Sequence, residues 1–271
     1  MIDFLVLMWK PLLACLVLTG IHGYLGVHVV ERKVIFVDLA LAQIAALGAT
    51  IAFLFGQDLH GPTTYWFSLG ATFLGAAIFS LTRTRREKIP QEAVIGIVYA
   101  VSAALAILIL SHSAEGDEHI RFMLVGNILL VRLPEIFKMT VLYTLVGLLH
   151  WQFRKTFILI STEPDTAYQK GIPVKLWDLL FYLTFGLVVT SSVQIAGVLL
   201  VFSFLIVPAV GAILFSNTFS QRLFIGWGLG ILASVAGIAA SYAWDLPTGA
   251  TIVTAFGATL AVTSILSLMR R

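Results

Sequence analysis

The chain has 271 residues, of which 59% are hydrophobic and only 11% are charged, whereas about 25% of the residues in a soluble domain are charged. This composition excludes an ordinary soluble protein and indicates a membrane protein with several spans. The net charge of +3 fits basic loops at a membrane surface, and no basic surface with interleaved aromatic residues argues for nucleic acid as a partner. The single cysteine, Cys15, excludes a disulfide framework and a thiolate metal cluster.

Apolar windows of about 17–25 residues mark membrane-spanning helices. The N-terminus carries Asp3 rather than a basic region ahead of the first window, and no convincing cleavage site follows it, so we expect this window to be retained as a span. The predicted fold is therefore an all-α membrane protein, a polytopic bundle of about eight or nine transmembrane helices. The windows are residues 4–25, 34–56, 65–81, 92–110, 136–151, 177–192, 196–215, 223–244 and 250–269.

Lysine and arginine gather in alternate connections between these windows, which predicts one topology. By the positive-inside rule the basic connections are cytoplasmic, so the N-terminus lies outside and the C-terminus in the cytoplasm. Residues 122–133 are too short to span and precede Pro134, which favours a re-entrant or interfacial segment. No repeat or linker suggests a second domain, and we expect residues 1–271 to form one membrane domain.

The second window contains one acid, Asp38, and one amide, Gln43. A carboxylate within a bilayer helix costs roughly 2.5–3.5 kcal/mol, so Asp38 is expected to face protein or a water-filled path. Residues five apart on a helix are rotated by about 140°, which places Asp38 and Gln43 on different faces. The alternative is that Asp38 lies near the cytoplasmic interface and pairs with Arg32 or Lys33.

Motifs of soluble and membrane enzymes are missing from the sequence. It has no GxxxxGK[ST] phosphate loop, no HExxH, no GxSxG and no paired-cysteine zinc spacing. An intramembrane enzyme is therefore the weaker class, and active transport would need an external source of energy.

Six stretches together resemble the integral-membrane permeases of bacterial ABC importers for manganese, zinc and iron. The resemblance covers most of the chain and depends on the order and spacing of the stretches. They are GVHVVERKVIFVDLALAQIAALG, QEAVIGIVYAVSAALAILILS, GNILLV, QKGIPVKLWDLL, QIAGVLLVFSFLIVPAVGAILF and WDLPTGATIVTAFGA.

This resemblance implies the helical fold of type II importers, the vitamin B12 class, in a multi-pass protein of the bacterial inner (plasma) membrane. It implies a non-catalytic subunit that works as a homodimer around one pathway. A separate cytoplasmic ATPase would bind the ATP, and a periplasmic or extracellular substrate-binding protein would deliver the substrate. Membrane lipids are the other expected partner, and no covalently bound cofactor is expected.

The resemblance also assigns the segment 208–222 to the cytoplasmic coupling helices that dock on the ATPase. Pro208 and Gly211 can break the seventh helix, and the polar residues that follow are turn and helix-cap types, which favours a short exposed helix. The alternative is an ordinary loop between helices. The candidate coupling residues are Pro208, Gly211, Asn217, Thr218, Phe219, Ser220, Gln221 and Arg222.

In the metal-transporting relatives the second helix carries an Asp and a His four residues apart, on one face. Leu39 and Gln43 stand at these positions here, and Asp38 points about 100° away from Leu39 on a regular helix. Asp38 therefore replaces the missing acid only if the helix is distorted. Asp38 and Gln43 are the candidate residues of the translocation pathway.

A short outer loop, SHSAEGDEHIR, contains several metal-donor residues. It could capture metal at the extracellular mouth, and the alternative is an acidic, solvated loop. The candidate ligands are His112, Asp117, Glu118 and His119.

The predicted function is thus the permease subunit of an ATP-driven importer, which forms the pathway for a divalent metal ion such as zinc, manganese or iron. Two alternatives remain within transport. The same machinery could import a metal chelate or small organic ligand, or the protein could be a self-powered secondary carrier.

Overall fold

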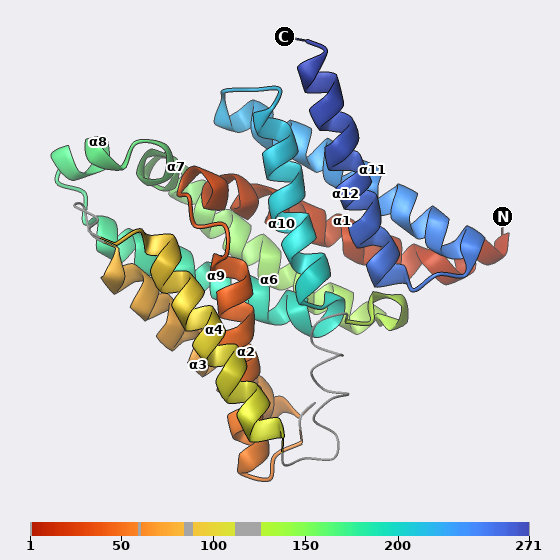
Figure 1. Cartoon of the computed structure of the whole chain (residues 1–271), viewed down its shortest axis with the longest axis horizontal. Coiled ribbons are helices and arrows are strands. Elements are labelled where there is room, and N and C mark those ends of the chain that lie inside the picture. Colours follow the sequence, from red (N-terminus) through yellow and green to blue (C-terminus); the bar gives the residue numbers. More distant parts are fainter. Residues whose placement is uncertain (1, 59–60, 84–88, 112–125, 271) are drawn as a thin grey trace. The chain divides into compact units, whose positions relative to one another are not determined.

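The computed structural model describes residues 2–58, 61–83, 89–111 and 126–270, and its regular elements in these ranges are all helical (Figure 1). The predicted all-α fold is confirmed. The elements are α1 (Ile2–Glu31), α2 (Val37–Leu54), α3 (Pro62–Thr82), α4 (Gln91–Leu110), the 3₁₀ turn η1 (Ile128–Leu130), α6 (Leu133–Gln152), α7 (Arg154–Thr162), α8 (Pro164–Gln169), α9 (Val174–Ala196), α10 (Val198–Ile213), α11 (Phe219–Trp244) and α12 (Thr248–Leu268).

Every one of the predicted apolar windows contains a helix. Seven helices in the described part are long and apolar enough to cross a membrane, namely α1, α2, α3, α4, α9, α11 and α12. The other two windows hold α6, which has 20 residues, and α10, which is apolar but has only 16 residues. The number of helices therefore agrees with the predicted bundle.

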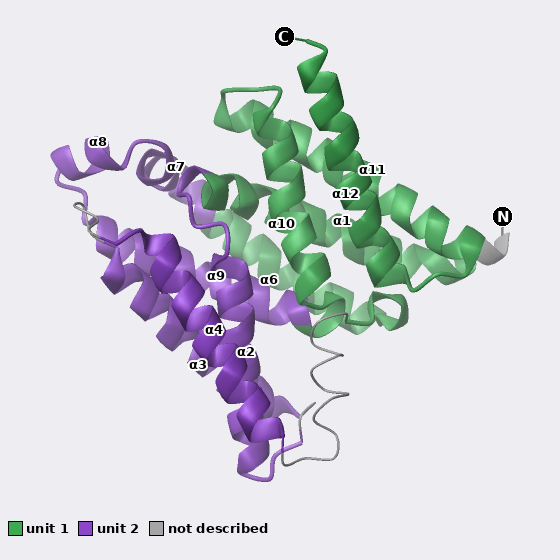
Figure 2. Cartoon of the chain, viewed as in Figure 1, with its two compact units in different colours: residues 1–30, 124–149, 194–271 green, residues 31–123, 150–193 purple. Residues whose placement is uncertain are grey.

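The chain folds into two compact units that are interleaved along the sequence (Figure 2). Unit 1 consists of Met1–Val30, Leu124–Leu149 and Gln194–Arg271, and unit 2 consists of Glu31–Met123 and His150–Val193. Each unit has its own packed helices. The single domain over residues 1–271 stays a prediction.

Small residues let α2 pack closely against α3 and α4 in unit 2. A Cβ added at Gly48 of α2 would lie 2.6 Å from the carbonyl oxygen of Phe67 on α3. Gly75 of α3 also faces α2 closely, because an added Cβ would lie 2.4 Å from Ile44 Cδ1 and would force that side chain to move. Close backbone approach of this kind is the usual way in which membrane helices gain packing energy.

In unit 1, α1 lies against α10 and α11. Gly26 of α1 touches the backbone of α10, where an added Cβ would collide with the carbonyl oxygen of Leu205. The indole N–H of Trp227 on α11 donates a hydrogen bond of 2.9 Å to the carbonyl oxygen of Gly20. The helices α10, α11 and α12 also pack on one another.

The connection between α9 and α10 is a single residue, Gly197, with φ = 76°. The sequence predicts a turn at residues 192–195, but α9 continues through Ala196, because Gly197 can adopt the left-handed backbone that ends the helix. Gly126 packs on the backbone of Ala196 and Gly197, and the N–H of Asn127 donates to the carbonyl oxygen of Ile195 (3.2 Å). This sharp turn is thus held by the segment that precedes η1.

The predicted re-entrant segment, residues 122–133, is described only from residue 126 onward. In that part it contains η1, a turn of three residues, and no spanning helix before α6 begins at Leu133. The described part therefore fits a segment that does not cross the membrane.

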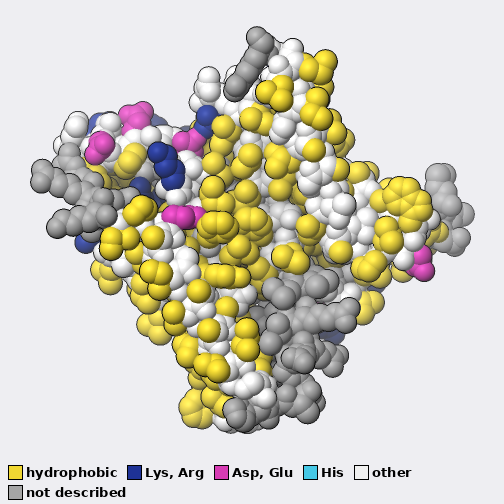
Figure 3. Space-filling model, in the orientation of Figure 1, with side chains coloured by type: hydrophobic (Ala, Val, Ile, Leu, Met, Phe, Trp, Pro, Cys, Tyr) yellow, Lys and Arg dark blue, Asp and Glu magenta, His cyan; other side chains and the backbone are white. Residues whose placement is uncertain are grey.

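Apolar side chains cover most of the visible surface of α2, α3 and α4 in unit 2 (Figure 3). Lysine, arginine and acidic side chains gather instead at the end of this unit that carries α7 and α8 (Figure 3). This segregation is expected for helices that lie in lipid and end at a polar interface.

We expect Gly26→Ala to lower the stability of the protein by about 1–3 kcal/mol or more, because the new methyl group would force α1 away from α10. Gly20→Ala on the same helix is the matched control, since an added Cβ there has no neighbour within 4 Å. Thermal unfolding of the two variants in detergent measures the difference. Equal melting temperatures would show that α1 and α10 do not pack as described.

Candidate functional site

Asp38 lies in the first turn of α2 and is completely buried, with 0% of its surface exposed. Neither carboxylate oxygen has a hydrogen-bond partner in the part of the chain that the structure describes. The positive end of the helix dipole favours an anion there, but a buried carboxylate without a partner must be neutralised by a proton or a cation. Asp38 is therefore chemically able to receive a cation.

An ion pair of Asp38 with Arg32 or Lys33, the alternative raised by the sequence, is absent among the described residues. Arg32 binds Asp178 instead, with 2.6 Å between Nη1 and Oδ1. Lys33 is exposed and has a left-handed backbone with φ = 57°. The connection between α1 and α2 thus directs Arg32 toward Asp178 and leaves Lys33 exposed, and neither residue pairs with Asp38.

Gln43 lies on a different face of α2 from Asp38. The helix is continuous from Val37 to Leu54, so no distortion brings Asp38 round to the position of Leu39. Leu39, Gln43 and Leu47 are half-buried, at intervals of four residues, whereas Asp38 is on the fully buried side. The two polar residues therefore do not form one ligand pair in this helix.

The described residues contain no group of three or more His, Cys, Asp or Glu side chains that could hold a metal ion. The loop candidates His112, Asp117, Glu118 and His119 lie outside the described residues, and their role stays a prediction. A metal that passes through the described part would therefore meet few strong ligands.

Three buried histidines take part in aromatic packing. His28 lies between Tyr24 and Phe219, with ring centroids 4.7 Å from each. His150 stacks on Phe157 at 4.2 Å, and its Nε2 is 2.8 Å from Thr184 Oγ1. His22 places Nδ1 3.0 Å from the carbonyl oxygen of Leu18. These contacts account for the three histidines as packing residues.

The segment proposed for coupling differs from its predicted shape. Pro208 and Gly211 are buried within α10, which continues unbroken to Ile213, so the prediction that they break the helix was wrong. Neighbouring helices allow a proline inside a membrane helix, and Pro208 lies beside Gly226 of α11, where an added Cβ would be 3.5 Å from the Pro208 carbonyl oxygen, an ordinary contact. A separate short helix is also absent, because only residues 214–218 separate the end of α10 at Ile213 from the start of α11 at Phe219.

Ser216 organises the turn between α10 and α11. Its hydroxyl donates to Gln221 Oε1 (2.7 Å) and accepts the N–H of Thr218 (3.2 Å), while Arg222 Nε donates to its carbonyl oxygen (2.8 Å). Phe219 packs inward on α1. The exposed candidate coupling residues are Asn217, Thr218, Ser220 and Gln221.

Two short helices, α7 and α8, lie between α6 and α9, where the sequence indicated only a basic loop. Their buried residues Ile160 and Ala167 pack with Val174 at the start of α9. The exposed side of the pair carries Arg154, Lys155 and other polar residues. The sequence contained one signal for α8, namely Pro164, because proline is favoured at the first position of a helix.

A buried cluster of charged residues, which sequence reasoning missed, lies in the same unit. Arg32 Nη1 and Arg83 Nη1 both donate to the carboxylate of Asp178, Arg83 at 2.8 Å from each oxygen. Arg32 Nε also donates to Ser161 Oγ on α7 (2.8 Å). We call Arg32, Arg83, Ser161 and Asp178 the arginine cluster. An acid within the apolar window 177–192 was the signal that could have found it.

Burial lowers the pKa of the Arg32 guanidinium, and the Asp178 carboxylate opposes this effect. An arginine side chain is not deprotonated in proteins, so Arg32 keeps its charge. The cluster therefore places two cations around one anion, and its geometry must compensate for their desolvation.

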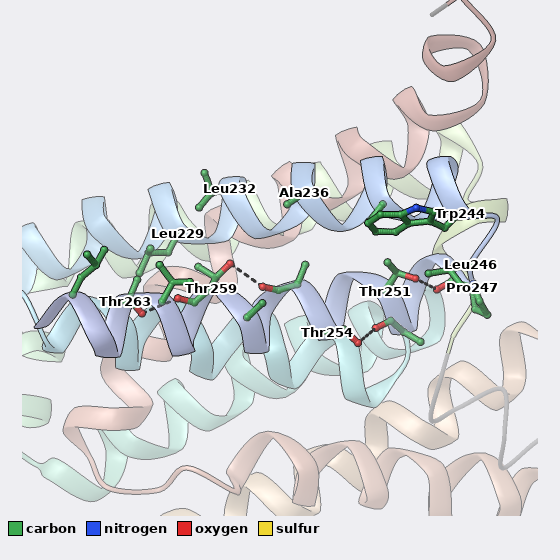
Figure 4. Close-up of a pocket in the computed structure, with 16 residues that line it drawn as sticks. Leu229, Leu232, Ala236, Trp244, Leu246, Pro247, Thr251, Thr254, Thr259 and Thr263 are labelled. Atoms are coloured by element: carbon green, nitrogen blue, oxygen red, sulfur yellow. Dashed lines mark hydrogen bonds between the residues drawn. The ribbon is translucent and has the colours of Figure 1, made fainter. Parts of the chain in front are cut away.

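A groove of ≈ 750 Å³ lies between α11 and α12 in unit 1 (Figure 4). Its lining residues are apolar or threonines, and the hydroxyls of Thr251, Thr254 and Thr259 donate to carbonyl oxygens of their own chain four residues earlier. Trp244 closes one end (Figure 4). Carboxylate, imidazole and thiolate ligands are absent from this lining, so the groove suits an apolar group rather than a metal ion.

Comparisons with known proteins identify one family. The profile of the ABC 3 transport family matches residues 5–268. The manganese transport system membrane protein MntC of Listeria monocytogenes is 26% identical over 251 residues, which cover 90% of this chain and 85% of that protein. A protein of Haemophilus influenzae named "Probable iron transport system membrane protein" is 26% identical over 91% of this chain and 88% of its own length.

A solved structure shares the fold. PsaBC from Streptococcus pneumoniae, determined in complex with Fab, has a TM-score of 0.79 and covers 97% of this chain and 93% of the compared chain. The sequence identity is 24%. This likeness shows the arrangement of helices alone.

We expect Asp178→Ala to destabilise the protein by about 3–5 kcal/mol, because it leaves two buried arginines without their carboxylate. Arg132→Ala is the control, since the Arg132 side chain is 78% exposed in its pair with Glu135, and its loss should cost no more than about 1 kcal/mol. Denaturation of both variants in detergent checks this. A similar small effect for both would mean that the cluster contributes little to stability.

Proposed function

Because the chain belongs to the ABC 3 transport family, we propose that it is the permease subunit of an ATP-driven importer and forms the pathway for a divalent metal ion. The membership confirms the family resemblance that the sequence suggested. The observation that carries the proposal is the family match over residues 5–268, almost the whole chain. The names of the relatives, which refer to manganese and iron transport, favour a metal as the substrate.

In this proposal α2 lines the pathway through Asp38 and Gln43. Asp38 supplies a carboxylate whose oxygens have no partner among the described residues, and Gln43 adds a neutral amide oxygen on another face. Oxygen donors suit manganese and other hard divalent ions better than soft ones. Since the two residues do not share a face, they would contact a passing ion one after the other rather than hold it tightly.

The energy would come from a separate ATPase on the cytoplasmic side, since the chain has no phosphate loop. Two surfaces are proposed to receive it. One is the α10–α11 turn with its exposed residues Asn217, Thr218, Ser220 and Gln221, and the other is the α7–α8 pair. Both connections carry basic residues that the positive-inside rule places in the cytoplasm.

The remaining partners follow from the same proposal. A second copy of the chain would complete the pathway, and a periplasmic or extracellular binding protein would deliver the substrate. The protein would lie in the bacterial inner (plasma) membrane with its N-terminus outside and its C-terminus in the cytoplasm.

A second candidate substrate is a metal chelate or a small organic ligand. The observation that favours it is the pair Leu39 and Gln43, which stands where metal-transporting relatives carry an acid and a histidine. An amide and an aliphatic side chain bind a free transition metal weakly and suit a larger, partly apolar substrate.

The test is uptake by the assembled complex in vesicles, with manganese, zinc and iron compared in the presence and absence of the binding protein. We expect saturable, ATP-dependent uptake of one of these ions. ATP hydrolysis without uptake of any free ion would overturn the free-metal proposal and favour the chelate or organic ligand. Uptake without any ATPase would favour a secondary carrier.

We expect Asp38→Asn to reduce metal uptake by about tenfold or more, the effect of losing ~1.4 kcal/mol of interaction with the passing ion. The amount of folded protein should stay near normal, because the amide has the same shape and Asp38 holds no ion pair among the described residues. Asp245→Asn is the matched control: Asp245 is exposed and its left-handed backbone suits asparagine. Equal metal uptake by both variants would contradict the proposed role of Asp38 in the pathway.

A further inference from the structure

The arginine cluster joins four segments of unit 2 that are far apart in the sequence. Arg32 lies in the connection between α1 and α2, and Arg83 directly follows α3. Ser161 belongs to α7, and Asp178 belongs to α9. The side chains of Arg32 and Asp178 are both 0% exposed. The cluster is therefore an internal junction.

Arg32 is held in one orientation by three contacts. Its Nε donates to Ser161 Oγ (2.8 Å), its Nη1 donates to Asp178 Oδ1 (2.6 Å), and its guanidinium carbon lies 3.9 Å from the centroid of the Phe181 ring. A guanidinium is planar and its donors form a rigid fork, so these contacts fix direction as well as distance. The position of α7 is thus tied to that of Arg32.

The same connection leads directly to α2. Only residues 33–36 separate Arg32 from Val37, where α2 begins, and the N–H of Val37 donates to the carbonyl oxygen of Val34 (3.1 Å). The N–H of Phe36 donates to Glu92 Oε1 on α4 (3.0 Å). Asp38 lies one residue after this start. A shift of Arg32 therefore reaches the turn of α2 that carries Asp38.

Fold stability alone does not explain a buried cluster of this kind. Replacing a buried ion pair by well-packed apolar residues is often neutral or stabilising, because the pair must be desolvated. Here two cations share one carboxylate, which makes the desolvation harder to offset. What such a cluster does provide is a single, directional geometry between the segments that it joins.

We propose that the arginine cluster carries a displacement of α7 to the start of α2, and that Arg32, Ser161 and Asp178 are positioning residues for transport. This rests on the proposed function, in which α7 and α8 receive the movement of the ATPase. The cluster acts through Asp38 and α2, and its own residues do not contact the substrate.

The experiment measures the distance between spin labels on α7 and α2 in the full complex, with and without ATP. Labels at Lys155 of α7 and at Leu54, the exposed far end of α2, lie outside the cluster, and Cys15→Ala removes the native thiol. With the cluster intact we expect one narrow distance distribution that ATP does not change, because α7 and α2 move together.

Ser161→Ala removes the hydrogen bond between α7 and Arg32, together with the bond of 2.9 Å that the Ser161 hydroxyl donates within α7 to the carbonyl oxygen of Phe157. We expect it to widen the distance distribution or to make it change with ATP, and to reduce manganese uptake severalfold while ATP hydrolysis continues. Arg32→Lys keeps the charge but loses the fork, and it should act in the same direction. Thr162→Ala is the matched control, because the hydroxyl of Thr162 donates only within α7, to the carbonyl oxygen of Ile158 (3.0 Å).

Two results would overturn the inference. One is a Ser161→Ala distance distribution equal to that of Thr162→Ala. The other is a fall in uptake that matches the loss of folded protein, since this would make the cluster purely structural. Absence of manganese, zinc and iron uptake in every variant, including the unaltered protein, would contradict the metal proposal instead, and the label distances would still decide the role of the cluster.

Discussion

A charge in an apolar interior must be paired or neutralised, and this constraint decides how the few ionisable residues of the chain are used. Asp178 meets it with two arginines at 2.6 and 2.8 Å. Asp38 does not meet it within the described residues, since both of its oxygens lack a partner. The first arrangement makes a rigid junction, and the second leaves a carboxylate that needs a cation or a proton. The paired carboxylate of Asp178 thus has a structural role, and the unpartnered carboxylate of Asp38 has the role proposed in transport.

Buried hydroxyl groups also need a partner, and they find one in hydrogen bonds to the backbone of their own helix. Buried hydroxyls such as those of Thr50 and Ser234 donate to carbonyl oxygens four residues earlier in their own helices. Polar side chains can therefore occupy lipid-facing or packed positions without an unsatisfied donor. Close contacts at Gly26 and Gly48 then allow helices to associate through their backbones. The packing thus uses small residues at close contacts beside large buried side chains such as Phe79 and Phe204.

Much of the fold could be predicted from hydrophobicity alone, because a span needs a long apolar window wherever its neighbours lie. The errors arose where tertiary contacts override local preference. Pro208 suggests a helix end, yet α10 continues to Ile213, because membrane helices tolerate an internal proline where neighbouring helices pack against it. Residues 154–169 look like a polar loop, yet they form α7 and α8, since Ile160 and Ala167 find a buried surface at the start of α9.

The sequence by itself determined that this is a membrane protein of helices, that it resembles metal-importer permeases, and that Leu39 and Gln43 replace an expected ligand pair. These conclusions depend on residue types and their spacing along one helix. Only the tertiary structure decided that Arg32 pairs with Asp178, 146 positions away, and that Asp38 is left without a partner among the described residues. The physical reason is that the neutralisation of a buried charge depends on which segments meet in space, and local sequence patterns do not contain that information.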